Sequence, residues 1–360
     1  MTRGLVFAAP DVPAAVEEIT LDPPGPHEVQ VRVEACGVCH TDLHVVETGG
    51  WGMPFPILLG HEGAGRVEEV GAGVTEVAPG DRVVVAWRAP CGDACPSCLR
   101  GDPRRCSNNR RARRRIRRAA DGALLSAVLR CGTFADRAIV HEACAVKVPE
   151  ELPVEQACLL ACGFSTGAGA ALWATPVREG SSVAVIGCGG VGLAVVQGAR
   201  LAGARQIVAV DVLPEKLAIA CDLGATDAID ARTGDAVAQV RELTGGVEFA
   251  FSAIGSPGGL VDAVRMCAYA GTATLVGVPP SGRSLDVDVE LDLFQAKVSI
   301  AVTHGGDTIP QQDFPFLAQA ALDGKLDLER FVTKTISLDE VPAALEELHA
   351  PTGVRTVVKL

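Results

Sequence analysis

The spacing of apolar residues changes along the chain, and this change predicts two different kinds of domain. In the first 150 residues, short apolar runs such as 29–33, 65–70 and 82–86 are separated by turns rich in Gly and Pro. Short strands with turn signals between them are typical of a mostly-β region. We therefore expect a β domain in this part of the chain.

From residue 183 onward, short runs rich in Val, Ile and Ala alternate with longer stretches of helical pattern. The runs at 183–186, 207–210, 249–253 and 273–276 contain few polar residues, which is the pattern of strands buried on both faces of a parallel sheet. The stretches between them predict crossover helices, so the whole region predicts a doubly wound α/β sheet. The pattern becomes mixed after about residue 302, and residues 338–348 predict a terminal helix.

Composition and charge narrow the class of protein. A length of 360 residues is long for one core and sufficient for two, and 48% apolar with 21% charged residues is ordinary for a globular protein. The net charge of −12 argues against a nucleic-acid partner. Neither an apolar run of 18 residues nor a signal-peptide pattern is present, so we expect a cytoplasmic protein without a membrane partner.

A glycine-rich turn follows the first buried strand of the α/β region, and a helical pattern follows the turn. Residues 187–192 have the sequence Gly-Cys-Gly-Gly-Val-Gly. Gly187 allows the tight turn, Gly189 lets the backbone approach a pyrophosphate, and Gly192 lets the helix pack closely on the strand. The pyrophosphate is expected at the helix N-terminus, where free N–H groups favour anions.

The next strand ends at Asp211, about 20 residues further on, as a dinucleotide-binding fingerprint requires. Its carboxylate can accept hydrogen bonds from the ribose hydroxyls and would repel a 2′-phosphate. The following residues, Val212 and Leu213, provide no Arg for such a phosphate. The turn and Asp211 therefore predict NAD rather than NADP; the alternative is a plain glycine turn with a surface Asp.

The 13 cysteines are an odd number in a large chain, so their spacing favours metal binding over a disulfide framework. Cys39, His61 and Cys162 occur in polar or glycine-rich segments, and two thiolates with one imidazole suit a catalytic zinc with one open position. A second group lies within 16 positions and predicts a separate metal site: Cys91, Cys95, Cys98 and Cys106.

These motifs resemble those of the zinc-containing medium-chain alcohol dehydrogenases. Residues 39–44, 60–73 and 161–167, the four-cysteine segment and the glycine turn occur in the order found in that family, and the resemblance continues to Arg355 and Thr356. It implies a GroES-like catalytic domain, residues 1–163 and 303–360, and a Rossmann coenzyme domain, residues 164–302.

The resemblance also implies roles for individual residues. Cys39, His61 and Cys162 are expected to bind the catalytic zinc, and Glu62 to approach the metal during ligand exchange. His40 and Arg355 match contacts to the pyrophosphate. The remaining expected cofactor contacts are Thr166, Gly190, Val191 and Val278.

The family's structural zinc has two residues between its first two cysteines, whereas three separate Cys91 from Cys95, with Ala94 as the insertion. Tetrahedral thiolate binding tolerates two to four intervening residues, so we still expect zinc there. The alternative is a loop with free or oxidised thiols.

The same resemblance predicts a proton relay and a substrate pocket. Thr41 is expected to take the proton of the alcohol, since a hydroxyl both donates and accepts. His44 is expected to deliver it to solvent, since imidazole titrates near neutral pH; a plain surface histidine is the alternative. Trp87 and Thr303, together with Val278, are expected to line the pocket, and a structural role is the alternative for Trp87.

The zinc and coenzyme motifs do not explain one segment, residues 104–118, which contains nine arginines. In relatives this segment runs towards the substrate entrance, and its length resembles that of longer-loop actinobacterial members. A solvated basic loop, an anion-binding collar for a charged substrate and a nucleic-acid patch are the three interpretations, and the last lacks aromatics for base stacking.

The motifs together predict hydride transfer between an alcohol or aldehyde and NAD. Three substrate classes stay open: simple or aromatic alcohols, a formaldehyde–thiol adduct, and an anionic metabolite. A non-catalytic zinc or redox sensor is the rival hypothesis, but a sensor need not keep an open catalytic site. We expect a homodimer or homotetramer.

Overall fold

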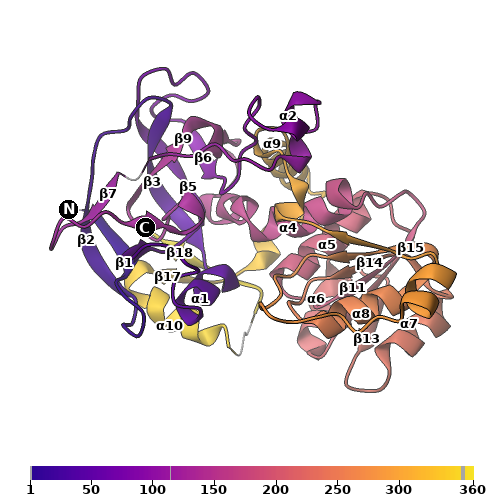
Figure 1. Ribbon diagram of the computed structural model, residues 1–360. Coiled ribbons are helices and arrows are strands. Elements are labelled where there is room, and N and C mark those ends of the chain that lie inside the picture. The colour runs from indigo at the N-terminus through magenta and orange to yellow at the C-terminus, as the bar shows by residue number, and fades with distance from the viewer. Residues whose placement is uncertain (1, 114, 350–352) are drawn as a thin grey trace. The chain divides into compact units, whose positions relative to one another are not determined.

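The computed structural model describes residues 2–113, 115–349 and 353–360 (Figure 1). The chain divides into two compact units, Met1–Cys162 with Ile309–Leu360, and Gly163–Thr308. These divisions lie one residue before and six residues after the boundaries expected from the sequence. The second shift arises because Gly306, with a φ of 66°, packs tightly on the backbone of Ser165 and Thr166 within the second unit.

The unit Gly163–Thr308 is built on a six-stranded sheet in the order β13-β12-β11-β14-β15-β16, with every pair parallel. This is the strand order of the dinucleotide-binding fold. The strands are β11 (Ser182–Ile186), β12 (Gln206–Asp211), β13 (Asp227–Asp230), β14 (Val247–Ser252), β15 (Cys267–Leu275) and β16 (Ser299–Val302). The helices are α4 (Gly163–Gly169), α5 (Gly190–Leu201), α6 (Pro214–Asp222), α7 (Ala236–Thr244) and α8 (Pro257–Met266).

The four apolar runs expected as buried strands are confirmed as β11, β12, β14 and β15. All five residues of β11 are buried, because helices pack over the parallel sheet and leave no solvent-facing side. Ala184, Val208 and Ala250 on three adjacent strands belong to one hydrophobic core. The glycine turn joins the carboxyl end of β11 to the N-terminus of α5.

The other unit contains two sheets with mixed and mostly antiparallel pairing. The first has the order β7-β2-β1-β4-β8; the second has the order β10-β6-β5-β3-β18-β17, with β9 paired to β3. The strands are β1 (Thr2–Phe7), β2 (Ala15–Leu21), β3 (Glu28–Gly37), β4 (Ile57–Leu58), β5 (Glu62–Val70), β6 (Arg82–Val85), β7 (Ile116–Arg118), β8 (Ser126–Ala127), β9 (Arg137–His141), β10 (Ala145–Lys147), β17 (Val332–Ser337) and β18 (Arg355–Lys359). The helices are α1 (His40–Glu47), α2 (Pro96–Leu99), α3 (Val154–Ala157), α9 (Pro310–Leu322) and α10 (Val341–Glu347).

The helix expected at residues 338–348 is confirmed, but it is not the last element of the chain. Residues 338–348 form a 3-10 turn, Leu338–Glu340, followed by α10, but the last element is the strand β18. This strand pairs with β17 and β3, and its residues Val357 and Val358 are buried. A helix cannot end this chain because the final apolar residues complete the sheet.

In the part of the chain that the structure describes, no single helix is long and apolar enough to cross a membrane. The short helical segments Val154–Ala161 and Gly163–Ala174 meet that test only as a pair.

Candidate metal and coenzyme sites

Three distant chain segments bring Cys39, His61 and Cys162 together. Cys39 is the N-cap of α1, His61 immediately precedes β5, and Cys162 follows the 3-10 turn Cys158–Ala161. The ligand atoms of these residues and of Glu62 all lie within 4.8 Å of one another. The fully buried Nε2 of His61 has no hydrogen-bond partner among the described residues. A buried imidazole nitrogen facing two thiols therefore fits a metal ligand set with one open position.

The electrostatics of this cluster favour the thiolate at Cys39 and the thiol at Cys162, whose pKa is raised by the neighbouring Cys39 and by burial. A hydrogen bond from the Cys162 thiol, together with the nearby His61 and Arg355, holds the pKa of Cys39 well below its ordinary value despite burial. Burial raises the pKa of Glu62 to about 7, although the guanidinium of Arg355 opposes this rise. The charged atoms of Glu62 and Arg355 are 3.5 Å apart, so the carboxyl group has a partner beside the ligand set.

Asp42 is a site residue that the sequence reasoning missed. Its Oδ2 lies 2.9 Å from Nδ1 of His61, and its Oδ1 accepts a hydrogen bond of 2.8 Å from the amide of Gly60. Both side chains are fully buried. A carboxylate behind a ligating histidine sets its tautomer and ring orientation, leaving Nε2 free for the metal. The available signal was an acidic residue three positions after Cys39, in the first turn of a helix.

The four predicted cysteines Cys91, Cys95, Cys98 and Cys106 converge into one buried cluster around α2. The Cys106 sulfur lies 3.8 Å from that of Cys95 and 3.6 Å from that of Cys91. Four sulfurs at about 2.3 Å from a tetrahedral zinc are separated by roughly 3.8 Å, so the spacing fits zinc despite the extra residue. Backbone N–H groups of Cys98 and Ser107 lower the pKa of Cys95 to about 5, which favours the thiolate that a metal requires.

Helix α1 carries the residues expected to relay a proton. Thr41 and His44 are half-buried and lie three positions apart, which places them on one face of the helix. The rings of His40 and His44 have centroids 6.4 Å apart, and Nε2 of His40 lies 3.2 Å from the carbonyl oxygen of Leu348. Burial lowers the pKa of His40.

Arg355, expected to contact the pyrophosphate, lies in β18 with its guanidinium buried beside the metal ligands. It donates a hydrogen bond of 2.9 Å to the carbonyl of Val38 and faces Glu62. The backbone amide of Val38 in turn binds the carbonyl of Thr356. Arg355 therefore ties the last strand to the segment that carries Cys39.

The glycine turn of the second unit has the geometry that its sequence predicts. Gly187 has a φ of 87°, and a Cβ on Gly192 would lie 1.7 Å from the carbonyl oxygen of Gly187. A Cβ on Gly189 would meet nothing within 4 Å, so this face of the turn is open to a ligand. Gly190 and Val191 begin α5 and are half-buried.

Asp211 ends β12 beside this turn. Its Oδ2 accepts a hydrogen bond of 2.6 Å from the amide of Cys188, and its Oδ1 accepts one of 2.9 Å from the amide of Leu213. These bonds hold the carboxylate next to the glycine turn, where a ribose is expected.

The remaining predicted residues lie in different surroundings. Thr166 is buried in α4, Val278 is half exposed in the loop after β15, and Thr303 is buried after β16, where its hydroxyl donates to Asp307 at 2.9 Å. Trp87 is half-buried and packs against the core formed by Val31, Val67 and neighbouring residues. Trp87 therefore contributes to the packing of this core.

The arginine-rich segment is largely neutralised by the protein itself. Arg104 donates hydrogen bonds of 2.6 and 3.1 Å to the buried Asp313 of α9. Arg115 pairs with Glu28. Six of the eight described arginines in residues 104–118 form ion pairs with carboxylates of this chain: Arg104, Arg105, Arg110, Arg115, Arg117 and Arg118.

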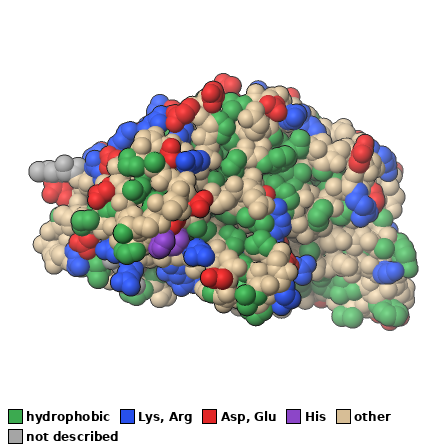
Figure 2. All heavy atoms as spheres, turned by 90° about the horizontal axis from the view of Figure 1, so that it is seen from above, with side chains coloured by type: hydrophobic (Ala, Val, Ile, Leu, Met, Phe, Trp, Pro, Cys, Tyr) green, Lys and Arg blue, Asp and Glu red, His purple; other side chains and the backbone are tan. Residues whose placement is uncertain are grey.

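Figure 2 shows acidic and basic side chains intermixed on the face it presents. Arg114 lies outside the described residues. Ion pairs of Arg104, Arg115 and Arg118 thus fix parts of this segment to the fold, while Arg105, Arg110, Arg111 and Arg113 are exposed to solvent.

Comparisons with known proteins agree with this geometry. Residues 25–150 match the family model for the alcohol dehydrogenase GroES-like domain, and residues 190–322 match that for zinc-binding dehydrogenases. Over 368 residues, covering 99% of both chains, the protein is 36% identical to S-(hydroxymethyl)glutathione dehydrogenase of Photobacterium damsela subsp. piscicida.

Two solved structures are similar over the full chain. One is an alcohol dehydrogenase zinc-binding domain protein from Burkholderia ambifaria, with a TM-score of 0.92 and 36% identity, covering 100% of this chain and 98% of that one. The other is benzyl alcohol dehydrogenase from Acinetobacter calcoaceticus, with a TM-score of 0.91 and 32% identity, covering 100% and 99%.

The chain therefore belongs to the zinc-containing medium-chain alcohol dehydrogenases. It is a zinc-dependent oxidoreductase that moves a hydride between an alcohol or aldehyde and a nicotinamide, and NAD is the coenzyme typical of this family.

Proposed function

We propose that this enzyme oxidises primary alcohols, or reduces their aldehydes, at a zinc held by Cys39, His61 and Cys162. The observation that carries the proposal is the buried cluster of two thiols and an imidazole, with the orphaned Nε2 of His61 at its centre. Zinc, when bound there, polarises the alcohol oxygen and lowers its pKa while NAD accepts the hydride. The rest of the reaction depends on where this chain holds and moves protons.

Thr41 takes the hydroxyl proton, and His44 passes a proton to solvent. Their positions three residues apart on α1 support this order, since side chains at that spacing are neighbours. Asp42 orients His61, and Arg355 keeps Glu62 beside the ligands until ligand exchange. On the coenzyme side, Gly187 to Gly192 and Thr166 bind NAD, while Asp211 accepts from the ribose hydroxyls.

A panel of alcohols tests the proposal. The zinc-loaded enzyme is mixed with NAD and each alcohol, and NADH formation is followed by absorbance, with Cys162→Ala as the matched inactive variant. Turnover by the native enzyme and none by the variant is the expected result. If the native protein contains zinc but does not bind NADH, the result would instead favour a non-catalytic zinc or redox sensor.

A second candidate substrate is a formaldehyde–thiol adduct. It is favoured by the 36% identity to S-(hydroxymethyl)glutathione dehydrogenases over 99% of the chain. Formaldehyde with and without added glutathione distinguishes the two candidates, because only an adduct dehydrogenase requires the thiol.

We also propose that the enzyme forms a homodimer or homotetramer. In the described sheet of the second unit, β16 is an edge strand, and unpaired edges favour pairing with another chain. Large apolar side chains stand exposed nearby in the chain, including Phe294 at 82% and Val302 at 58% exposure. Light scattering tests this proposal: a mass of a single 37.2 kDa chain would reject it.

A further inference from the structure

Residues 88–118, which include the four-cysteine cluster, concentrate positive charge in an acidic chain. They contain 11 of the 32 Lys and Arg residues, all of them arginines, and only two carboxylates, Asp93 and Asp102. Their formal charge is therefore +9, and the rest of the chain carries −21 to give the total of −12. Five carboxylates from elsewhere in the chain pair with this segment, which still leaves an excess of four positive charges.

Several of these arginines are exposed and have weak ion pairs or none among the described residues. Arg105 is 81% exposed and lies 3.5 Å from Asp102, while Arg110 lies 3.8 Å from the 82% exposed Asp93. Exposed pairs of this kind contribute little, so the guanidinium groups stay available. Three further exposed arginines form no ion pair with a described carboxylate: Arg100, Arg111 and Arg113. We call these five residues the arginine surface.

The cysteine cluster holds part of the arginine surface together. Arg100 is two residues from Cys98, and Arg105 is one residue from Cys106. The sulfur atoms of the cluster all lie within 4.8 Å of one another, so these two arginines start from neighbouring points of the backbone. Arg100 also ends α2, where its amide bonds back to the carbonyl of Pro96 at 3.2 Å.

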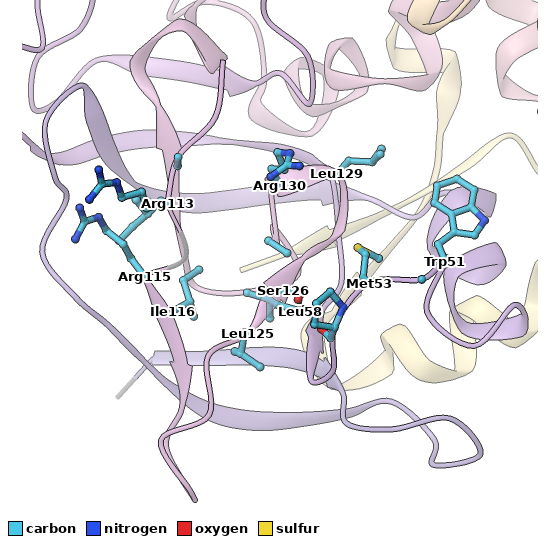
Figure 3. A pocket seen from close by; sticks show the side chains of 15 residues that line it. Trp51, Met53, Leu58, Arg113, Arg115, Ile116, Leu125, Ser126, Leu129 and Arg130 are labelled. Atoms are coloured by element: carbon cyan, nitrogen blue, oxygen red, sulfur yellow. Dashed lines mark hydrogen bonds between the residues drawn. The ribbon is translucent and has the colours of Figure 1, made fainter. Parts of the chain in front are cut away.

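Hydrogen bonds fix the backbone of the remaining arginines. The amide of Arg110 donates to the carbonyl of Ala89 at 3.2 Å, and the amide of Arg113 donates to the buried Glu28 at 2.7 Å. Figure 3 shows Arg113 beside Arg115 at the rim of a cavity, with its guanidinium directed away from the apolar lining. Like charges are thus held on a fixed backbone, and a partner that binds them has little ordering cost to overcome.

The chemistry of the arginine surface favours a protein as its partner. Leu99 is 71% exposed and lies between Cys98 and Arg100, so an apolar contact stands among the charges. Arginine is enriched and lysine depleted at protein interfaces, and residues 88–118 contain no lysine. They also contain no Phe, Tyr or Trp on which bases of a nucleic acid could stack. The −21 charge of the rest of the chain would repel an extended polyanion, whereas a short acidic segment need not reach it.

We infer that the arginine surface docks an acidic segment of a partner protein, with Leu99 contacting an apolar side chain of that segment. The planar guanidinium groups bind carboxylates through paired hydrogen bonds. The attraction between opposite charges speeds association and weakens as salt rises. The inference does not depend on the proposed alcohol oxidation, because neither Leu99 nor any of the five arginines is a candidate metal or coenzyme ligand.

Binding of an acidic peptide to the zinc-loaded enzyme tests the inference. A fluorescein-labelled peptide of Glu-Glu-Leu repeats should bind saturably at low salt, measured by anisotropy. Its affinity should fall between about 0.01 M and about 0.1 M salt, over which the Debye length shrinks from about 30 to about 10 Å. A fourfold variant should bind the peptide at least about tenfold more weakly, because charge-assisted contacts are lost. Its substitutions are Arg100→Gln, Arg105→Gln, Arg111→Gln and Arg113→Gln.

The matched control removes the same charge from exposed arginines of the second unit and should bind the peptide as the native enzyme does. Its substitutions are Arg178→Gln, Arg205→Gln, Arg232→Gln and Arg265→Gln. The absence of saturable binding, or equal weakening by the two fourfold variants, would overturn the inference. Tighter binding of labelled oligothymidylate or of phosphatidylglycerol vesicles than of the peptide would also overturn it, because the partner would then be a nucleic acid or a membrane.

Leu99→Ala covers the case in which the first fourfold variant fails to fold. This substitution changes no charge, so binding of the Glu-Glu-Leu peptide should weaken at least about threefold through the lost apolar contact, while binding of polyglutamate should stay the same. An equal effect on both peptides, or no effect on either, would contradict the docking arrangement.

Discussion

Replacing Glu28 by Gln should destabilise the first unit, because Glu28 organises the arginine-rich segment. Its side chain is only 3% exposed. Oε1 accepts a hydrogen bond of 2.7 Å from the amide of Arg113, while Oε2 accepts one of 2.8 Å from the amide of Gly25 and another from the guanidinium of Arg115. An amide keeps one acceptor oxygen, but it turns an NH₂ group towards donors and leaves Arg115 without its counter-charge.

The magnitude follows from these contacts. A buried group left unsatisfied costs about 1–3 kcal/mol, and breaking a buried ion pair about 3–5 kcal/mol. Because Gln retains one acceptor and Arg115 is partly solvated, we expect a loss of about 2–4 kcal/mol in the free energy of unfolding. For a unit of this size the loss corresponds to roughly 5–12 °C in Tm. Thermal and denaturant unfolding, followed by tryptophan fluorescence, measures it.

The matched control is Arg105→Gln. Arg105 is 81% exposed and lies 3.5 Å from Asp102, so its loss should change the free energy of unfolding by no more than about 0.5 kcal/mol. In 1 M NaCl the effect of Arg105→Gln should vanish, whereas that of Glu28→Gln should persist, since buried pairs are screened less. Equal effects of the two variants, or a native-like Glu28→Gln, would refute the reasoning.

The same residue predicts a pH dependence. Burial raises the pKa of Glu28, but the hydrogen bonds from Arg113, Gly25 and Arg115 outweigh it and lower the pKa below its ordinary value. A lowered folded-state pKa stabilises the fold above the unfolded pKa of about 4.3, and this contribution is lost as pH falls through the folded pKa. The stability gap between native and Glu28→Gln proteins should therefore be full at pH 7 and shrink in acid.

Further predictions concern the metals and the coenzyme. Cys162→Ala should abolish turnover but keep the fold, whereas Cys98→Ala should lower the unfolding temperature and the zinc content, because a structural zinc contributes folding free energy; two zincs in Cys98→Ala would contradict this. Asp42→Asn should weaken zinc binding at His61 by about 10–100-fold, measured by competition with a chelator, and an unchanged affinity would remove Asp42 from the site. Asp211→Gly should reduce the ratio of kcat/KM with NAD to kcat/KM with NADP, and a native enzyme that prefers NADP would contradict the role proposed for Asp211.

Local patterns in the sequence identified four of the six described strands of the second unit, whereas the edge strands β13 and β16 were not predicted. The apolar runs β11, β12, β14 and β15 alternate with helical stretches, and Gly187 to Gly192 join one strand directly to one helix. Such features depend on neighbouring residues, since a positive φ or a close strand–helix contact favours glycine. The four cysteines of the α2 segment were also identifiable, because all lie within 16 positions.

Only the tertiary structure decided which distant residues meet. Cys39, His61 and Cys162 could be paired from the sequence by family resemblance, but nothing local indicated that Asp42 turns inward behind His61. Periodicity likewise predicted the helix within residues 338–348, but it did not indicate that the residues after it form the strand β18, which pairs with β3 and β17.

The arginine-rich segment shows this limit most clearly. Its sequence indicates a dense positive charge, yet the partners Glu17, Glu28 and Asp313 come from positions 85 or more residues away from the arginines they bind. The field at a charge depends on which opposite charges lie within a few ångströms, and only the folded chain determines those distances. The sequence determined the chemistry available in this protein, and the tertiary structure decided which charges and ligands face one another.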